Sequence, residues 1–263
     1  APLYPLPSRE TAKTQLTCSN RKVLLTFGLI SPNKGIETVI EALPAVVDQH
    51  PDILYIIVGR THPGVVAHQG EAYRHRLQQR VHERNLKSNV RFVDKFVGEA
   101  ELFNYIAASD ICITPFINQA QITSGTLTYS MAAGAVVLST PYWHALEVLA
   151  HQPDQLFPAL NATSLSERIN DFLDHRDKLE QARQTAREYG SYITWPKIGA
   201  RYLQLLKTIK KETHQTRQNS ETEAVVVPPL KFDHLYRLLD STGVLQHARF
   251  SIPKYQDGYC VDD

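Results

Sequence analysis

The sequence predicts an α/β fold in which a parallel sheet of about six strands carries helices on both faces. Five short runs are apolar on successive residues, namely 23–27, 53–58, 90–93, 111–114 and 136–139. Continuous apolarity is typical of strands that are covered on both faces, as in parallel sheets. Longer segments with helical spacing of their apolar residues lie between the runs. This alternation predicts parallel strands joined by crossover helices.

Three crossover helices are predicted between these strands. The first carries an apolar stripe over residues 36–47, and Pro44 is expected to kink it or to break it in two. The second spans residues 73–86 and the third spans residues 102–107. A short edge strand and three further helical segments are expected after the last apolar run, at residues 156–157, 165–173, 176–189 and 195–209.

Composition changes predict the domain organisation. Residues 23–208 are expected to form one compact domain. Residues 209–229 are polar and end in two prolines, which is the composition of a linker. Residues 230–263 restart an apolar pattern that is too short for a core of its own, and we interpret them as the start of a truncated further domain. Since the chain has no initiator Met and no signal peptide, we expect a fragment of a longer protein.

Charge and cysteine content disfavour several classes of partner. Lys and Arg total 28 against 27 for Asp and Glu, so no positive excess exists for binding nucleic acid. The three cysteines, Cys18, Cys112 and Cys260, lie far apart, which argues against a disulfide framework or a zinc site. No apolar run approaches the roughly 20 residues of a membrane span. We therefore expect a cytoplasmic protein with no transmembrane segment and no nucleic-acid partner.

The loops after the strands hold the first candidate binding residues, because open parallel sheets bind ligands at the carboxyl ends of their strands. Gly28 permits close backbone approach, and Lys34 can place a charge on an anionic ligand. Arg60 follows the second strand and suits a phosphate or a sugar hydroxyl. Phe96 follows the third strand, where its ring suits a nucleobase. An ordinary turn, a solvated side chain or plain packing is the alternative reading of each residue.

The loop after the fourth strand is the most specific signal. Thr123, Ser124, Gly125 and Thr126 stand at a predicted helix start, where several backbone N–H groups have no partner and converge on one point. Such a cluster suits a diphosphate. Helix capping by Thr123 or Ser124 is the alternative. Anion binding is favoured because one capping residue suffices and the loop has four candidates.

Other chemistries lack their usual motifs. The sequence contains no GxGxxG after its first strand, no GxxxxGK[ST], no HExxH and no GxSxG. Dinucleotide, P-loop, zinc-protease and serine-hydrolase sites are therefore disfavoured. His144 and Glu147 lie three residues apart, but no third ligand accompanies them, so we predict no metal site.

Five motifs carry a resemblance to a known family: FGLISPNKGIETVIEAL, LYIIVGR, VRFVDKFVGEAELFNYIAASDICITP, SMAAGAVVLST and TWPKIGARYLQLL. Over residues 23–207 the chain resembles the Rossmann-like, nucleotide-sugar-binding C-terminal domain of GT-B glycosyltransferases of the large retaining family (group 1, or family 4-like). The resemblance implies that Lys34 holds the distal phosphate and that the loop before SMAAG supplies amides to the diphosphate, with no metal or other cofactor. It also implies that an acceptor-binding domain precedes this one, with residues 1–22 as the connecting segment.

Three positions depart from the family pattern. Leu29 stands where the family has an arginine, and Gln121 and Tyr129 stand where it has two glutamates. The carboxylates expected near the transferred sugar and near the ribose are therefore absent from these positions. The motif AQITSGTLTYSMAAG with STPYWHALEVL resembles a bacterial subgroup that carries a further C-terminal domain.

The leading hypothesis is transfer of a hexose from a nucleotide-diphosphate sugar to a carbohydrate acceptor, with retention of configuration. Lys34 and the amides of residues 124–126 would stabilise the departing diphosphate, Gln121 would face the sugar, and Phe96 would lie by the base. Glu147 would reach the ribose or cap its helix. The chain alone is expected to be inactive, because the site is shared between two domains. The alternatives are a non-catalytic binding or scaffolding module, and an NAD-dependent dehydrogenase, which the missing GxGxxG disfavours.

Overall fold

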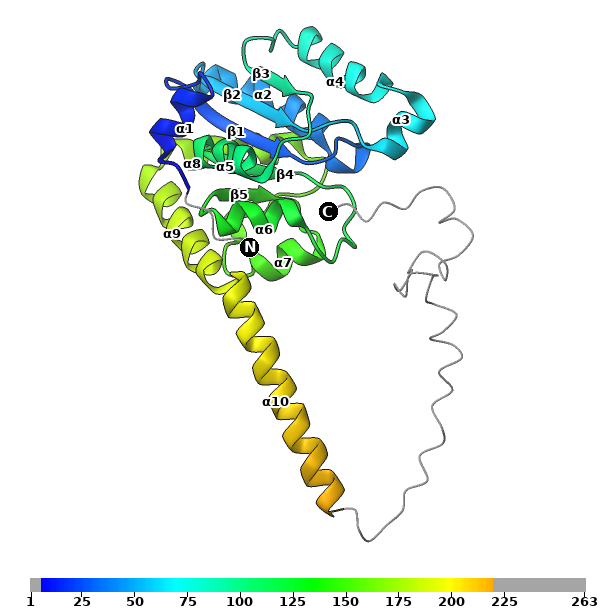
Figure 1. Cartoon of the computed structure of the whole chain (residues 1–263). Coiled ribbons are helices and arrows are strands. Elements are labelled where there is room, and N and C mark those ends of the chain that lie inside the picture. The colour runs from blue at the N-terminus through cyan, green and yellow to red at the C-terminus, as the bar shows by residue number, and fades with distance from the viewer. Residues whose placement is uncertain (1–5, 220–263) are drawn as a thin grey trace. The chain divides into compact units, whose positions relative to one another are not determined.

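The computed structural model describes residues 6–219 of the chain. Two compact units divide the chain between Trp195 and Pro196. The first unit contains the sheet and the helices around it (Figure 1). The described part of the second unit belongs to a single helix, α10 (Trp195–Asn219). The predicted division at residue 208 and the domain assignments beyond it stay predictions, and residues 230–263 lie outside the described part.

The sheet has five parallel strands in the order β3-β2-β1-β4-β5. Their bounds lie within one residue of the predicted runs: β1 (Lys22–Phe27), β2 (Ile53–Val58), β3 (Val90–Val93), β4 (Ile111–Thr114) and β5 (Val136–Ser139). The expected edge strand is reduced to one bridge between Ser139 and Leu156. In register, Phe27 pairs with Val58, so β1 and β2 end together. The α/β fold is confirmed, with five strands where about six were expected.

Helices cover both faces of the sheet (Figure 1). Alternate residues of β1 point to opposite faces: Leu24 joins a core with α2, α4 and α8, and Leu25 joins one with α5, α6 and α7. The helices of the first unit are α1 (Arg9–Gln15), α2 (Ile36–Gln49), α3 (Pro63–Gln69), α4 (Ala72–Glu83), α5 (Glu99–Ala108), α6 (Gly125–Ala132), α7 (Trp143–Val148), α8 (Ala162–Asp174) and α9 (Arg176–Tyr192). Short 3-10 turns lie at Pro32–Lys34 and Pro153–Gln155.

Helix α2 runs through Pro44 as one element, so the break into two pieces is wrong and the alternative, a kink, stays a prediction. A proline inside a helix removes one backbone hydrogen bond. The buried stripe of α2, which includes Val39, Leu43 and Val46, compensates because it packs on the sheet and on α8. Asn170 of α8 also donates a hydrogen bond to the carbonyl of Ala45 (3.5 Å). Tertiary packing therefore outweighs the local effect of the proline.

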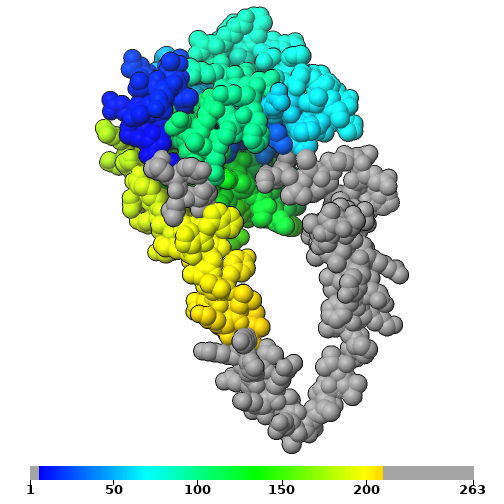
Figure 2. Space-filling view, viewed as in Figure 1, coloured from blue at the N-terminus to red at the C-terminus, as the bar shows by residue number. Residues whose placement is uncertain are grey.

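A charged cluster around Asp110 lies at the amino ends of the strands. The Asp110 carboxylate accepts hydrogen bonds from the Lys13 ammonium (2.7 Å) and from the backbone N–H of Val23 (2.8 Å). It also pairs with Arg183 of α9 (3.4 Å) and with Arg9 (3.7 Å). Through Lys13 the cluster holds α1, which packs against α5 on the face seen in Figure 2. Part of the predicted connecting segment is thus an ordered helix of the first unit.

Helix α10 is longer than the sequence predicts. It continues to Asn219, although residues 209–229 have the composition of a linker. Several of its large apolar side chains are exposed, including Trp195, Tyr202 and Leu206. None of the helices in the described part of the chain combines the length and the apolarity that a membrane span requires.

Candidate functional site

A cavity of about 270 Å³ opens where β1 and β2 end. This is the position at which open parallel sheets bind their ligands. Six of the predicted site residues line it: Gly28, Lys34, Arg60, Phe96, Gly125 and Thr126. The lining also includes residues outside the predicted set of site residues: Phe27, Leu29, Val58, Gly59, Lys95, Val97, Leu102 and Tyr129. The loops after β1, β2 and β3 and the start of α6 therefore meet around one cavity.

The cationic end of the cavity is built around Gly28. The Lys34 side chain is only 3% exposed, and its ammonium lies 4.3 Å from the centre of the Phe116 ring, a cation–π contact. A Cβ atom placed on Gly28 would lie 3.7 Å from Lys34 Nζ and 3.7 Å from Thr126 Oγ1. The Lys34 ammonium, from the turn after β1, and the Thr126 hydroxyl, from the start of α6, thus converge on one glycine. The structure brings Lys34 beside the turn at 123–126, while its role in binding stays a prediction.

The start of α6 provides backbone donors at the same end. Ser124 is the N-cap, and its hydroxyl accepts a hydrogen bond from the N–H of Leu127 (3.2 Å). The N–H groups of Gly125 and Thr126, the first two helical residues, have no acceptor within the helix. Among residues 6–219 no hydrogen bond to either group is formed. Capping and anion binding are therefore compatible, because Ser124 caps the helix while two further amides border the cavity.

The loop before α6 is held by the start of α7. The backbone N–H groups of Trp143 and His144 donate to the carbonyls of Gln119 (3.0 Å) and Gln121 (3.2 Å). The His144 ring accepts a hydrogen bond at Nδ1 from the N–H of Ser124 (3.0 Å). Burial lowers the pKa of His144, although the nearby Glu147 carboxylate opposes the shift. A neutral imidazole is what this hydrogen bond requires, so His144 acts on the loop as an acceptor.

Four predicted residues lie outside the cavity lining: Gln121, Thr123, Ser124 and Glu147. The Gln121 side chain donates to the carbonyl of Thr123 (2.9 Å), within its own loop. Thr123 is exposed, and Glu147 is exposed on α7. Their proposed roles near the sugar, the diphosphate and the ribose stay predictions. In the described part of the chain no three His, Cys, Asp or Glu side chains are placed to hold a metal ion.

The opposite end of the cavity is apolar and aromatic. Phe96 is 81% exposed in the loop after β3, and Val97 and Leu102 line the wall beside it. An exposed ring at the rim suits the face of a nucleobase. Tyr129 lines the cavity from α6, three residues after Thr126. The sequence marks Tyr129 only as a departure from the family pattern, and no local signal places it in the lining.

Two glycines allow the loops to approach this closely. A Cβ atom on Gly59 would lie 1.9 Å from the carbonyl oxygen of Gly28, and one on Gly35 would lie 2.0 Å from that of Pro115. Both glycines also have positive φ, +144° and +59°. Any side chain would collide with rigid backbone at either position. The site thus depends on glycine at the contacts of the first loop with both neighbouring loops.

Backbone hydrogen bonds join the same loops. Ile30 donates to the carbonyl of Arg60 (2.8 Å), and His62 donates back to that of Ile30 (2.9 Å). On the other side Ile117 donates to the carbonyl of Asn33 (2.9 Å). The Asn33 side chain also accepts from the N–H of Asn118 (2.8 Å). The loop after β1 is therefore bonded to the loops after β2 and β4.

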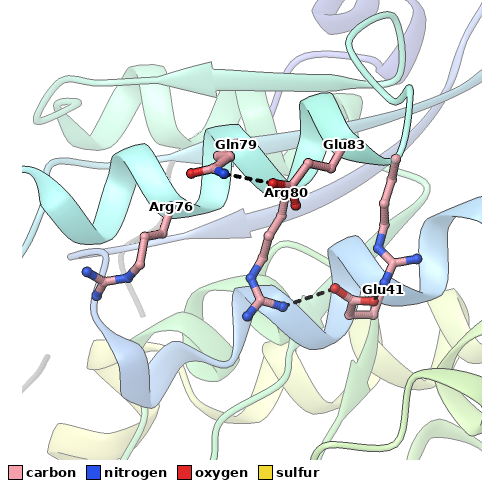
Figure 3. Close-up of a pocket in the computed structure, with 6 residues that line it drawn as sticks. Glu41, Arg76, Gln79, Arg80 and Glu83 are labelled. Carbon is pink, nitrogen blue, oxygen red and sulfur yellow. Dashed lines mark hydrogen bonds and ion pairs between the residues drawn. The ribbon is translucent and has the colours of Figure 1, made fainter.

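A second groove, of about 570 Å³, lies between α2 and α4 (Figure 3). Glu41 of α2 pairs with Arg80 (3.1 Å) and with Arg84. Gln79 donates to Glu83 (2.7 Å) on the same helix. The two ion pairs of Glu41 lie on the protein surface, where such pairs contribute little to stability. No loop at a strand end contributes to this groove, so the cavity beside Gly28 is the better candidate site.

Comparisons with known proteins agree with this architecture. The model of the family described as glycosyl transferases group 1 matches residues 8–189. Spore coat protein SA of Bacillus subtilis (strain 168) is 24% identical over 200 residues, covering 74% of this chain and 51% of that protein. The chain thus spans about half the length of the curated relative it matches.

Solved structures share the fold of the first unit. HepE from Anabaena, in complex with UDP and glucose, has a TM-score of 0.65 at 21% identity, over 77% of this chain and 51% of that one. The C-terminal domain of LpcC, a glycosyl transferase group 1 family protein from Francisella tularensis, has a TM-score of 0.62 at 15% identity, over 72% and 94%. The family match covers most of the chain, which therefore belongs to the glycosyl transferases group 1 family.

Proposed function

We propose that this chain binds a nucleotide-diphosphate sugar and that its protein transfers a hexose from it to a carbohydrate acceptor, with retention. The observation that carries the proposal is the convergence of Lys34 Nζ and Thr126 Oγ1 around Gly28. Family membership and the similarity to HepE, which was solved with UDP and glucose, support it. We further propose a cytoplasmic location and an acceptor-binding domain elsewhere in the same protein.

The two ends of the cavity match the two ends of a nucleoside diphosphate. An ammonium, a hydroxyl and two helix N-terminal amides form the charged end, a set of donors that suits phosphate oxygens. The exposed ring of Phe96 offers the other end a stacking surface. Negative charge builds on the diphosphate as it leaves the sugar, and preorganised donors stabilise that charge. The proposed chemistry needs no metal ion or other cofactor.

Gln121 takes the place nearest the transferred sugar in this proposal. In the structure its side-chain amide donates to the Thr123 carbonyl, so it has to turn when the sugar binds. Arg60 is exposed at the rim of the cavity, where it is available to a phosphate or a sugar hydroxyl. The Ser124 amide stays on His144, and the amides of Gly125 and Thr126 carry the diphosphate.

Substitution of Lys34 by Ala tests the binding site. We expect the affinity for UDP or GDP, whichever binds better, to fall by about 1.5 to 3 kcal/mol, the range for hydrogen bonds to charged groups. Isothermal titration calorimetry on the 263-residue chain measures the change. Lys87→Ala, at an exposed lysine after α4, is the matched control and should bind as the wild type does. Unchanged affinity in Lys34→Ala would show that Lys34 does not contribute to nucleotide binding.

A non-catalytic binding or scaffolding module is the second candidate. It is favoured by Gln121 and Tyr129, which put no carboxylate at the positions where the family pattern has two glutamates. The two candidates differ in turnover. The assay offers a panel of sugar nucleotides and carbohydrate acceptors to the protein that carries this chain with its acceptor-binding domain. If the first candidate is right, this protein should release nucleoside diphosphate from one of the sugar nucleotides. Binding without release would favour the scaffold.

A further inference from the structure

Arg74 of α4 is a buried cation between the loops after β2 and β3. The residue is only 3% exposed. Its guanidinium donates to the carbonyl of Gly59 (2.7 Å) and to the hydroxyl of Thr61 (3.1 Å), both in the loop after β2. Its Nη2 also pairs with Oδ1 of Asp94 (3.0 Å), the first residue after β3. One side chain therefore bonds two loops that line the cavity.

Stability alone does not explain this arginine. Burial of a charge costs free energy unless the charge is fully paired, and apolar side chains of similar size are often at least as stabilising. Glu71 (3.4 Å) and Asp94 balance the charge of Arg74, but both carboxylates are partly exposed to solvent. Within residues 6–219 the buried Nη1 of Arg74 has no hydrogen-bond partner. The arginine is better explained by the loops that it positions.

The loop after β3 needs a contact of this kind because packing does not hold Phe96. This ring is 81% exposed, so its place depends on the backbone that carries it. The Lys95 ammonium pairs with Glu101 (2.6 Å), but both side chains are partly exposed, and such ion pairs contribute little. Asp94, two residues before Phe96, is bonded instead to a buried and immobile partner. Arg74 is therefore placed to fix the backbone that leads to the ring.

We propose that Arg74 is a positioning residue, which holds the loop after β3 through Asp94 so that Phe96 presents its ring to the base of the nucleotide. This inference rests on the proposed function. Arg74 is not among the residues that line the cavity, so its effect on the ligand passes through the loops. The same guanidinium holds the carbonyl of Gly59, which itself lines the cavity. Helix α4 thereby fixes the spacing between two walls of the site.

A positioning role differs from a structural one in how its effect combines with that of Phe96. If Arg74 acts through the ring, loss of its contact with Asp94 lowers affinity only while the ring is present. A structural contact, or a direct effect of the Asp94 charge on the phosphates, changes affinity equally with and without the ring. A double-mutant cycle between Asp94 and Phe96 measures this coupling.

The experiment measures the affinity for UDP or GDP, whichever binds better, by titration calorimetry on the 263-residue chain. Asp94→Asn keeps the shape of the side chain and weakens the ion pair, so we expect the affinity to fall about threefold to fivefold. Phe96→Ala should also bind less tightly, and the addition of Asp94→Asn to it should change affinity by less than about 1.5-fold. Arg74→Lys keeps the charge but loses the planar fork, so it should lose at least as much affinity as Asp94→Asn.

Arg183→Lys is the matched control for Arg74→Lys. Arg183 is also buried, and it pairs with Asp110 at the amino ends of the strands. The control should lower the free energy of unfolding but keep the wild-type nucleotide affinity. Asp48→Asn, at an exposed position of α2, is the control for Asp94→Asn. Urea denaturation verifies that each titrated variant is folded, and Asp94→Asn carries the test if Arg74→Lys does not fold.

Two failures are distinguishable. If the wild type binds UDP or GDP, the positioning inference is overturned when Asp94→Asn or Phe96→Ala binds as the wild type does, or when their effects are additive. The nucleotide site then stands without it. If neither nucleotide binds the wild type, the proposed function fails and the positioning inference fails with it.

Discussion

Buried charged side chains lie at both the amino ends and the carboxyl ends of the strands, but their surroundings differ. At the amino ends, Asp110 is enclosed by Lys13 and Arg183 and by the backbone of Val23. At the carboxyl ends, Lys34 lies against the Phe116 ring and borders a cavity of about 270 Å³. The first arrangement closes on itself and holds the fold together, whereas the second faces a space that a ligand can fill. The amino ends of the strands therefore carry a charged group that serves stability, and the carboxyl ends carry one that is placed to serve binding.

Removal of the Asp110 charge should destabilise the protein by disrupting the charged cluster at the amino ends of the strands. Asp110→Asn leaves Lys13 and Arg183 without their carboxylate, and loss of one partner of a buried pair costs about 3 to 5 kcal/mol. We expect that decrease in the free energy of unfolding, measured by urea denaturation. Nucleotide affinity of the folded protein should not change. Asp48→Asn, at an exposed position of α2, is the matched control and should change stability by less than about 0.5 kcal/mol.

An Asp110→Asn protein that unfolds as the control does would show that the cluster contributes no net stability. A loss of nucleotide affinity at unchanged stability would contradict the separation of the two ends.

Gly35→Ala, beside the cavity at the carboxyl ends of the strands, should lower the free energy of unfolding by a smaller amount. Its φ is +59°, and the new Cβ would lie 2.0 Å from the Pro115 carbonyl oxygen. The backbone conformation costs about 1 to 2 kcal/mol and the collision about 1 to 3 more. Gly199→Ala is the control, because Gly199 lies within helix α10 with open space around it and no positive φ. Urea denaturation should show a loss for Gly35→Ala and none for Gly199→Ala, and Gly35→Ala should also weaken nucleotide binding. Equal stability of the two variants would mean that neither the backbone conformation nor the collision requires glycine at position 35.

The smallest effect is expected from the pH dependence of His144. Burial lowers its pKa in the folded protein. Its contribution to stability is therefore fully present above the unfolded value of about 6.5 and is lost as the pH falls toward the folded pKa. Protonation removes the acceptor for the Ser124 N–H, a loss of about 0.5 to 1.5 kcal/mol. Urea denaturation at about pH 8 and pH 5.5, compared with His144→Gln, isolates this contribution.

If His144→Gln keeps the wild-type pH dependence, the loop at residues 119–124 does not depend on a neutral imidazole. His151→Gln, which replaces an exposed histidine outside this loop, is the matched substitution for comparison.

The strands were the most predictable part of the fold. Their apolar runs are continuous, so the bounds of β1 to β5 agree with the sequence within one residue. Helix α3 was not predicted, because none of its residues is buried and it leaves no apolar stripe to detect. The continuation of α10 over residues 210–219 was missed for a related reason, since that stretch is polar.

The cavity was predictable as far as topology alone determines it. Parallel strands bring Gly28, Arg60 and Phe96 to one edge of the sheet whatever the details of packing. The contribution of Tyr129 depends on how α5 lies against α6, and no local pattern encodes that. Gln121 lies outside the lining because the start of α7 holds its loop.

The hydrogen bonds that join the loops after β1, β2 and β4 have a consequence for how this protein can change in evolution. Ile30 is bonded to Arg60 and His62, and Asn33 is bonded to Ile117. An inserted or deleted residue in any one of these loops would shift the partners of the other two. The lengths of these three loops are therefore constrained together, although the loops lie far apart in the sequence. Relatives with altered specificity should differ in the residue types of these loops before they differ in loop length.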